Sequence, residues 1–533
     1  MNVPRLLAVA LAAAISLSSA QAAPAPEGAL DRSFGHEGMY LAQTPEEYFS
    51  PAGIALQRDG KILVLGGIGS LHDDSWPNCR LTRLLPNGTP DTSFGDHGSQ
   101  RVGDPNGYTS CTGLAVGADG KIVISGYIAK NFVALRYLAD GSRDTSFGDA
   151  GMARTTFTDL GFRASAFDMV LQDDGKPILV GRAYDDSVWP VRYRFAMVRY
   201  GTDGRLDSGF GDGGRVLTSF ADFSRFDAEA EAVTLLPDGR ILVVGGLHGV
   251  YATAIARYTP DGRPDSSFGN NGRIASFGDN LNRGGASLTL QPDGRFLMAR
   301  PLLGNEGYST VVRHFADGRL DPSFQHITYI GLVSSVQLQA DGRILVSGLS
   351  TYNDPGRPQG EVIRLNPDGT RDESFVMEPF DFGGGMDYFT GLALQPGGKI
   401  VVLAQAHLSD RLSELGVARL QATTYCIADG FDPRRYVGFS DSGWFSASGH
   451  DHRGAGFGVI GRGQTTTIAR AGLHLFKASE AASGAKIDAA VFATRPDRGW
   501  GLGRVSANAG AGVDFALLDP RLDDLACRTS HQH

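Results

Sequence analysis

The 533-residue sequence is poor in cysteine and tryptophan, with four residues of each. It contains no apolar run of the roughly 20 residues that a membrane-spanning helix needs, so we expect no membrane span. Positive charge is also scarce, because 49 basic residues stand against 58 acidic residues and give a net charge of −9. Nucleic-acid binding depends on clustered lysine and arginine, so this balance argues against a nucleic-acid partner.

Catalytic sequence motifs are absent too. The chain has no G-x-S-x-G elbow, no H-E-x-x-H pair and no P-loop, so we predict no catalytic residue from a motif. The glycine-rich run at Gly211–Gly214 is followed by no crossover helix and is interpreted as a turn, not as a dinucleotide site.

The first 22 residues have the pattern of a signal peptide. Arg5 precedes an apolar run from Leu6 to Leu17, and Ala20-Gln21-Ala22 forms an A-x-A cleavage site. We therefore expect residues 1–22 to be removed and the mature protein to be secreted or periplasmic.

One phrase, D-x-S-F, occurs seven times at intervals of 51 to 63 residues, with glycine in place of the serine in the fourth copy. A second phrase, typified by Asp59-Gly60-Lys61-Ile62, alternates with it seven times, and an Arg-Leu, Arg-Tyr or Arg-His pair precedes each later copy of the first. Internal repeats of this length indicate a repeat architecture. The aspartates and phenylalanines of the D-x-S-F phrase, taken as structural repeat residues, are Asp31, Phe34, Asp91, Phe94, Asp144, Phe147, Asp207, Phe210, Asp265, Phe268, Asp321, Phe324, Asp372 and Phe375.

Each unit is typical of four short β-strands joined by tight turns. Asp-Gly and Asn-Gly between apolar runs favour hairpins, because both tolerate the positive φ of such turns. The third strand of a unit, such as Ile62–Leu65, is apolar on both alternating faces, so it must be covered on both sides. We predict an all-β fold: a seven-bladed β-propeller of four-stranded antiparallel blades over residues 27–421. A β-solenoid is the structural alternative, but its coils are shorter than this period.

These phrases resemble the delta-60 repeat family of bacterial exported proteins. The resemblance extends from about Glu27 to Gln421 and rests on the alternation of "D-x-S-F-G-x-x-G" with "L-Q-x-D-G-K-I-L-V-x-G". It implies a β-propeller and carries no defined catalytic residues. Three positions depart from the pattern: Gln325 and Val376 replace the glycine after phenylalanine, and Gly209 replaces the serine. We expect altered turns there.

The D-x-S-F aspartate is expected to accept hydrogen bonds from backbone N–H groups one or two residues on, with the serine reinforcing this Asx turn. Phenylalanine would then pack between blades. The alternative is a calcium-binding loop, since runs such as Asp203–Asp207 carry two carboxylates. Calcium usually takes six to eight oxygens, so turn chemistry is favoured and calcium is retained only as a possible cofactor.

In an antiparallel chain the repeated turns share one face of the ring, and the variable connections share the other. Variable loops on a rigid scaffold commonly bind ligands, although exposed loops are polar without any function too. The candidate binding residues on the variable loops are Trp76, Asp185, Asp186, Trp189 and Glu306. We expect an unidentified glycan, peptide or protein ligand and a monomeric protein. The alternative function is a propeller hydrolase or lyase acting on a lactone or glycan, with acidic residues at the channel mouth.

Four cysteines in an exported chain suggest disulfides. Cys79 and Cys111 lie at the variable-loop ends of neighbouring units and form one candidate pair; Cys426 and Cys527 bracket the final segment and form another. Residues 425–528 are predicted to be a small β-rich domain, and residues 529–533 a disordered tail. His450 and His452 of His450-Asp451-His452 could share one face of a strand and chelate a metal, but no third ligand is identifiable. A solvated turn is therefore favoured and no metal site is predicted. Whether the two chain ends share a blade is left open by the sequence.

Overall fold

A computed structural model describes residues 25–422 apart from short gaps, and five strands beyond them. The gaps are residues 43–46, 71–77, 105–107, 189–190, 224–227, 248–251, 278–286, 302–307, 326, 351–358, 384–385, 396 and 410–411. The predicted signal peptide, the tail, Cys426, Cys527 and the segment His450–His452 lie outside the described residues. The five later strands are β27 (Gly458–Gly461), β28 (Gln464–Thr467), β29 (Ile487–Arg495), β30 (Gly499–Ala507) and β31 (Asp514–Leu517). They pair as one hairpin and one three-stranded antiparallel sheet.

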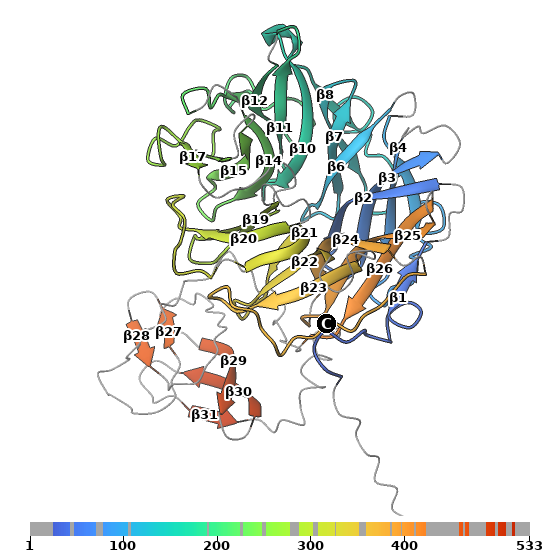
Figure 1. The fold of residues 1–533 in the computed structure, drawn as a ribbon, viewed down its shortest axis with the longest axis vertical. Helices are drawn as coiled ribbons and strands as arrows, with labels where there is room; N and C mark the ends of the chain where they lie inside the picture. Colours follow the sequence, from blue (N-terminus) through green and yellow to red (C-terminus); the bar gives the residue numbers. More distant parts are fainter. Residues whose placement is uncertain are drawn as a thin grey trace, which may run out of the picture.

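The rest of the described chain forms a ring of antiparallel sheets, which Figure 1 shows with the colours running from blue to orange around it. This confirms the predicted seven-bladed β-propeller. From the centre outward, blade 1 contains β2 (Glu47–Leu56), β3 (Ile62–Ser70), β4 (Asn78–Leu84) and β5 (Ser99–Val102), and blade 2 contains β6 (Ser110–Val116), β7 (Ile122–Ile128), β8 (Asn131–Tyr137) and β9 (Met152–Thr155). Blade 3 contains β10 (Arg163–Leu171), β11 (Pro177–Asp185), β12 (Arg192–Arg199) and β13 (Arg215–Thr218). Blade 4 contains β14 (Ala228–Leu235), β15 (Ile241–Leu247), β16 (Ala252–Tyr258) and β17 (Arg273–Phe277).

Blade 5 contains β18 (Ser287–Leu290), β19 (Phe296–Pro301), β20 (Tyr308–His314) and the first part of β21 (Ile327–Leu338). Blade 6 contains the rest of β21, β22 (Ile344–Ser350) and β23 (Gln359–Leu365). Blade 7 contains β24 (Met386–Leu394), β25 (Ile400–Ser409), β26 (Leu412–Leu420) and β1 (Met39–Leu41). The first strands of successive blades contact one another around the centre, and β24 contacts β2. A short 3-10 turn, η1 (Thr158–Leu160), is the one helical element of the described residues.

The core lies between blades, as the apolar runs of the sequence predict. All seven residues of β15 and of β22 are buried, because each central strand is covered on both faces by neighbouring blades. One apolar cluster joins Ile62 and Val64 of blade 1 to Val401 and Leu403 of blade 7, with Phe34 in the same cluster. Burial of these side chains is the main term that holds adjacent blades together.

Blade 6 differs at its outer edge. Residues 376–383 stand where a fourth strand would pair with β23, and they form no strand there. Val376, one of the two residues that replace the turn glycine, is 69% exposed, and the Met377 sulfur lies 3.2 Å from the Val362 nitrogen on the edge strand. Phe382 packs over Gly416 of blade 7. The altered turn expected from the sequence therefore replaces the outer strand by a packed irregular segment.

The two chain ends share blade 7. β1 pairs with β26 in the register Met39↔Ala418, Tyr40↔Val417 and Leu41↔Gly416, and Figure 1 shows the blue β1 beside the orange β26. The blade boundaries fall at neither of the two repeated turns. They fall at the variable connections, such as that between β5 and β6, so the first strand after each F-G-x-x-G turn is the outermost strand of the preceding blade. We call the face with the Asp-Gly and D-x-S-F turns the motif face, and the opposite face the variable-loop face.

Candidate functional site

The repeated motif forms a polar network on the motif face. In blade 2, Asp144 Oδ1 accepts hydrogen bonds from the Ser146 amide at 3.1 Å and from its hydroxyl at 2.5 Å. Asp144 Oδ2 pairs with Arg136 Nε at 2.8 Å and with Lys121 Nζ at 3.0 Å. The Arg136 guanidinium lies 4.4 Å from the centre of the Phe147 ring and donates through Nη1 to the Thr202 carbonyl of blade 3. Each motif therefore ties its own blade to the next one.

The same arginine–aspartate pair occurs in all seven blades. The pairs are Arg83–Asp91, Arg136–Asp144, Arg199–Asp207, Arg257–Asp265, Arg313–Asp321, Arg364–Asp372 and Arg419–Asp31. Each arginine also lies over the motif phenylalanine, at 4.4 to 5.0 Å from the ring centre. In blade 3, where Gly209 replaces serine, the backbone bond to Asp207 remains and the hydroxyl bond is lost.

These contacts keep the motif carboxylates ionised. Burial by itself raises the pKa of Asp31, but hydrogen bonds from Lys399 and Ser33 and the charge of Arg419 outweigh it and lower the pKa to about 2. The pKa values of Asp91 and Asp321 are lowered to about 2 in the same way, through Ser93 and Ser323 and the neighbouring cations. Within the described residues, no three His, Cys, Asp or Glu side chains gather as a metal site would require. The oxygens of the motif aspartate in blade 2 are engaged by serine, arginine and lysine.

Ring closure depends on a turn built from the two ends of the propeller, residues 28–29 and Gln421. In blade 1 the Gly88 amide donates to the Leu85 carbonyl and the Leu85 amide to the Thr89 carbonyl. In blade 7 the same two bonds join Gly28 to Gln421 and Gln421 to Ala29, at 2.8 and 2.7 Å. The turn that is covalently continuous in blade 1 is thus reproduced by two separate segments.

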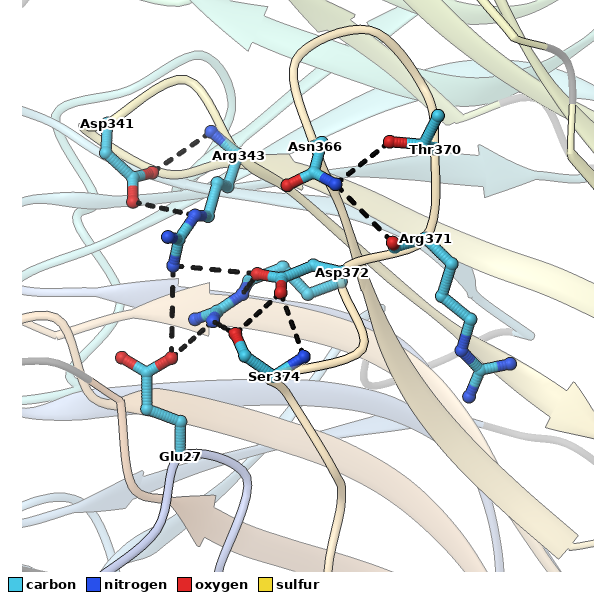
Figure 2. Close-up of polar contacts among 9 residues, drawn as sticks. Glu27, Asp341, Arg343, Asn366, Thr370, Arg371, Asp372 and Ser374 are labelled. Carbon is cyan, nitrogen blue, oxygen red and sulfur yellow. Dashed lines mark hydrogen bonds and ion pairs between the residues drawn. The ribbon is translucent and has the colours of Figure 1, made fainter.

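Glu27 completes this closing turn. Six of the seven motif arginines donate through Nη1 to a backbone carbonyl of the next blade: those of Ala139, Thr202, Pro260, Ala316, Pro367 and Pro86. The seventh, Arg364, is 1% exposed and pairs instead with the Glu27 carboxylate, which also lies 3.9 Å from Arg343 (Figure 2). A charged side chain from the N-terminus therefore takes the place of a carbonyl.

Of the predicted binding residues, Asp185 and Asp186 are described, and Trp76, Trp189 and Glu306 lie outside the described residues. Asp185 Oδ1 accepts hydrogen bonds from the Ser187 amide and hydroxyl, which lower its pKa. Asp186 lies 3.0 Å from Arg163 Nη1 of β10 and 3.9 Å from Lys130 Nζ, at the tip of the β7–β8 hairpin of blade 2. Asp186 thus belongs to a charged cluster at the variable-loop ends of blades 2 and 3.

A neighbouring cluster at the interface of blades 3 and 4 contains residues that the sequence reasoning missed. Arg182 of β11 donates through Nη1 to Glu229 Oε2 of β14 at 3.0 Å. Its guanidinium lies 5.2, 5.3 and 5.7 Å from the ring centres of Phe167, Tyr184 and Tyr193. We call these five residues the Arg182 cluster. The signal that could have found it is non-repetition, because the residues aligned with Arg182 in four other blades are Gly67, Tyr127, Gly246 and Leu349.

Two carboxyl groups with raised pKa values lie on first strands: half-buried Asp168 and buried Asp387. Burial raises the pKa of Asp168 to about 6, although its Oδ2 accepts a hydrogen bond from the Val233 amide of the next blade at 2.9 Å. Burial also raises the pKa of Asp387 to about 6; the Phe382 amide opposes this shift and the charge of Asp381 adds to it. Asp168 belongs to blade 3 and Asp387 to blade 7.

Asp168 occupies a position where neighbouring blades come close. A β-bulge precedes it, and glycine stands at the same point in blades 1, 2 and 7. A Cβ on Gly53, Gly113 or Gly391 would meet a side chain of the next blade at 3.0 to 3.3 Å. Asp168 instead bridges to a backbone amide of that blade. We interpret it as a positioning residue of the fold.

A hollow of about 390 Å³ lies on the motif face between blades 2 and 3. Its lining includes Asp119 and Asp174 of the Asp-Gly turns together with Lys121 and Arg136. These cations already pair with Asp144, so the hollow is part of the repeated network.

Comparison with known proteins agrees with the architecture. Four stretches, residues 57–94, 117–147, 236–268 and 339–375, match the model of a family described as a domain of unknown function (DUF5122) beta-propeller. They carry the repeated motifs of blades 1, 2, 4 and 6, and the chain is a β-propeller repeat protein. Among curated proteins none matches this chain. No helix of the described residues is long and apolar enough to cross a membrane.

Several solved structures are similar in fold. A protein of unknown function from Bacteroides caccae is 11% identical, with a TM-score of 0.32, over 62% of this chain and 92% of that chain. A protein of unknown function from Dyadobacter fermentans is also 11% identical, with a TM-score of 0.38, over 72% and 99% of the two chains. PorZ, a surface component of the type-IX secretion system of Porphyromonas gingivalis, is 9% identical, with a TM-score of 0.39, over 71% and 47%.

Proposed function

We propose that this chain is an exported protein of the delta-60 repeat kind that binds a ligand or partner on its variable-loop face. On the described part of the motif face, the recurring carboxylates and arginines pair with one another and with the next blade. The predicted signal peptide and the disulfide between Cys79 and Cys111 support secretion or a periplasmic location, since disulfides persist in oxidising compartments. The ligand is a glycan, a peptide or another protein.

The observation that carries this proposal is the Arg182 cluster. It joins blades 3 and 4, it is not part of the repeat, and it lies at the variable-loop end of a rigid scaffold. Binding sites in propellers and other scaffolds are commonly built this way, with function on the parts that vary. Asp186 and Arg163 extend the same surface toward blade 2.

The proposal is tested by probing a glycan and peptide array with the purified mature protein, with and without calcium. We expect binding that is weakened by Asp186→Asn or Arg182→Gln and unchanged by Arg205→Gln, a substitution of an 88% exposed residue on the motif face. A calcium requirement would support the alternative in which the repeated loops bind calcium. Binding that responds to Arg205→Gln and ignores both other substitutions would contradict the assignment to the variable-loop face.

The enzymatic alternative has less support. Raised pKa values suit general acids, and Asp387 and Asp168 have them. Both groups accept hydrogen bonds from backbone amides, and they stand on blades 7 and 3. Turnover of a lactone or glycan that Asp387→Asn abolishes, in a protein that still folds, would favour the enzyme over the binding module.

A further inference from the structure

We propose that the Arg182 cluster is a subsite for a uronate, the carboxylate-bearing sugar ring of an acidic polysaccharide. This inference rests on the proposed function and specifies the ligand class of the same face. Arg182 would bind the carboxylate, and Phe167, Tyr184 and Tyr193 would contact the ring.

The geometry leaves part of the guanidinium available. Arg182 donates through Nη1 to Glu229 Oε2 at 3.0 Å, and no other described residue accepts a hydrogen bond from it. The Arg182 side chain is 32% exposed, against 14% for Glu229. Guanidinium groups recognise carboxylates through a planar fork of donors, which an ammonium group lacks. The exposed third of the Arg182 side chain therefore offers donors to a ligand carboxylate, while its Nε is buried and pairs with no described residue.

The aromatic residues provide a platform beside that edge. The rings of Tyr184 and Tyr193 stack with centres 6.1 Å apart and an angle of 29° between their planes. Both side chains and Phe167 are half-buried, so part of each ring faces solvent. Aromatic faces of this kind suit the apolar side of a sugar ring, and tyrosine adds a hydroxyl for hydrogen bonding.

A purely structural role explains the cluster poorly. The motif arginine already ties each blade to its neighbour on the motif face, including blade 3 through Arg199 and the Pro260 carbonyl at 2.6 Å. At the Arg182 register position blade 1 and blade 4 have glycine, so their interfaces form without any such side chain. The fold therefore does not require three aromatic rings around an arginine at this interface.

Local charge also admits an anion. The described charged residues at these strand ends and hairpins include the cations Lys130, Arg163, Arg182, Arg192 and Arg194 and the carboxylates Asp185, Asp186, Glu229 and Glu231. Five positive charges against four negative charges leave a small positive excess on a protein whose net charge is −9. An acidic polysaccharide would be repelled less here than by the surface as a whole.

The test is affinity electrophoresis of the full mature protein in gels that contain polygalacturonate, with neutral galactan as the control polymer. We expect retardation by polygalacturonate alone, and a loss of affinity of at least tenfold for Arg182→Gln. The affinity of Arg182→Lys should lie between those of the unsubstituted protein and Arg182→Gln, because lysine keeps the charge and lacks the planar fork of donors. Arg205→Gln on the motif face should behave as the unsubstituted protein does, and thermal melting verifies that every variant is folded.

Glu229→Gln separates binding from packing. It keeps a hydrogen-bond acceptor for Arg182 and removes the competing charge, so a uronate subsite gains affinity several-fold. If the cluster only joins blades, Glu229→Gln lowers the melting temperature and does not raise the affinity for polygalacturonate. Equal retardation by both polymers, or unchanged affinity in Arg182→Gln, overturns the inference. If the array reports a neutral glycan or a peptide in place of uronates, the uronate inference fails while the binding function stands; if the array reports no ligand, the binding function itself fails.

Discussion

At the residue scale, each motif aspartate has two roles that the sequence reveals unequally. Its turn with serine follows from local chemistry, because an aspartate two residues before a serine readily accepts both hydrogen bonds. Its pairing with arginine could have been found from spacing. The arginine precedes the aspartate by eight residues in blades 1 to 6, as in Arg83 and Asp91, and that constant interval fits two strands joined by a fixed turn. Blade 7 does not follow this eight-residue interval, since Arg419 and Asp31 come from opposite ends of the propeller.

The lowered pKa values of these aspartates predict acid sensitivity. Asp31, Asp91 and Asp321 have folded pKa values of about 2 against an ordinary 3.8. A carboxyl group whose pKa is lower in the folded than in the unfolded state stabilises the fold at pH values above the unfolded-state pKa. That stabilisation is lost as the pH falls to the folded-state pKa. We expect the melting temperature to fall steeply between about pH 4 and pH 2. Asp321→Asn should cost about 2 kcal/mol at pH 7 and almost nothing near pH 2, as measured by denaturant unfolding across this range. A cost independent of pH would contradict the ionic role.

Asp387 predicts the opposite pH dependence of stability. Its folded pKa is raised to about 6, so its contribution is most favourable below pH 4 and is lost as the pH rises through 6. Asp387→Asn keeps an oxygen for the Phe382 amide, which now donates to Oδ2 at 2.9 Å. We expect this variant to be more stable than the unsubstituted protein by about 2 kcal/mol at pH 8, and equally stable at pH 4. Unfolding free energies at the two pH values decide the matter, and a loss of stability at pH 8 would refute the prediction.

At the element scale, alternation and turn residues predicted the strands well, because both are local properties of the chain. The strand β7 begins directly after the Asp119-Gly120 turn, and Tyr137 of the Arg-Tyr pair ends β8. The β-bulges and the lost fourth strand of blade 6 were not predictable in the same way. They depend on how closely neighbouring blades approach, as at Gly113 beside Met169, which is a property of packing.

Turn glycines predict a difference between two chemically identical substitutions. Gly88 has φ +85° and a Cβ there would meet the Phe34 ring of the preceding motif at 2.7 Å; Gly161 has φ +81° and no neighbour within 4 Å. Gly161→Ala should cost about 1 kcal/mol, the ordinary price of a left-handed residue. Gly88→Ala should cost at least about 2 kcal/mol more, because it also disturbs a buried interface between blades. Urea unfolding of both variants measures this; equal costs would contradict the inter-blade contact.

At the scale of the whole molecule, ring closure is the feature that the sequence left undecided. The same strands are predicted whether the blades are contiguous or shared, so no local pattern distinguishes the two arrangements. The pairing of Met39 with Ala418, and the closing turn between Gly28 and Gln421, are contacts between the two ends of the propeller. Glu27, which the sequence places where aspartate or asparagine precedes the turn glycine in other units, is a partner of buried Arg364.

Cross-linking tests this closure. Met39 and Ala418 lie opposite each other in antiparallel strands, so the double variant Met39→Cys, Ala418→Cys should form an intramolecular disulfide on oxidation. The cross-linked protein should unfold at a higher temperature than its reduced form, because the closing strand can no longer detach. Mass spectrometry of the digested protein identifies the bond. Each single variant is the control, and failure of the pair to link would argue against β1 in blade 7.

The division of labour between the two faces is the central claim, and one pair of variants tests it most directly. The measurement is the glycan and peptide array profile together with the melting temperature for Arg136→Gln on the motif face and Arg182→Gln on the variable-loop face. We expect Arg136→Gln to lower stability by about 2–3 kcal/mol, since it leaves buried Asp144 with fewer partners, while its array profile at 20 °C is unchanged. Arg182→Gln should melt close to the unsubstituted protein and lose binding. Both arrays are probed at a temperature where the variant is folded. The account would be contradicted if Arg136→Gln lost binding on the array while Arg182→Gln kept it.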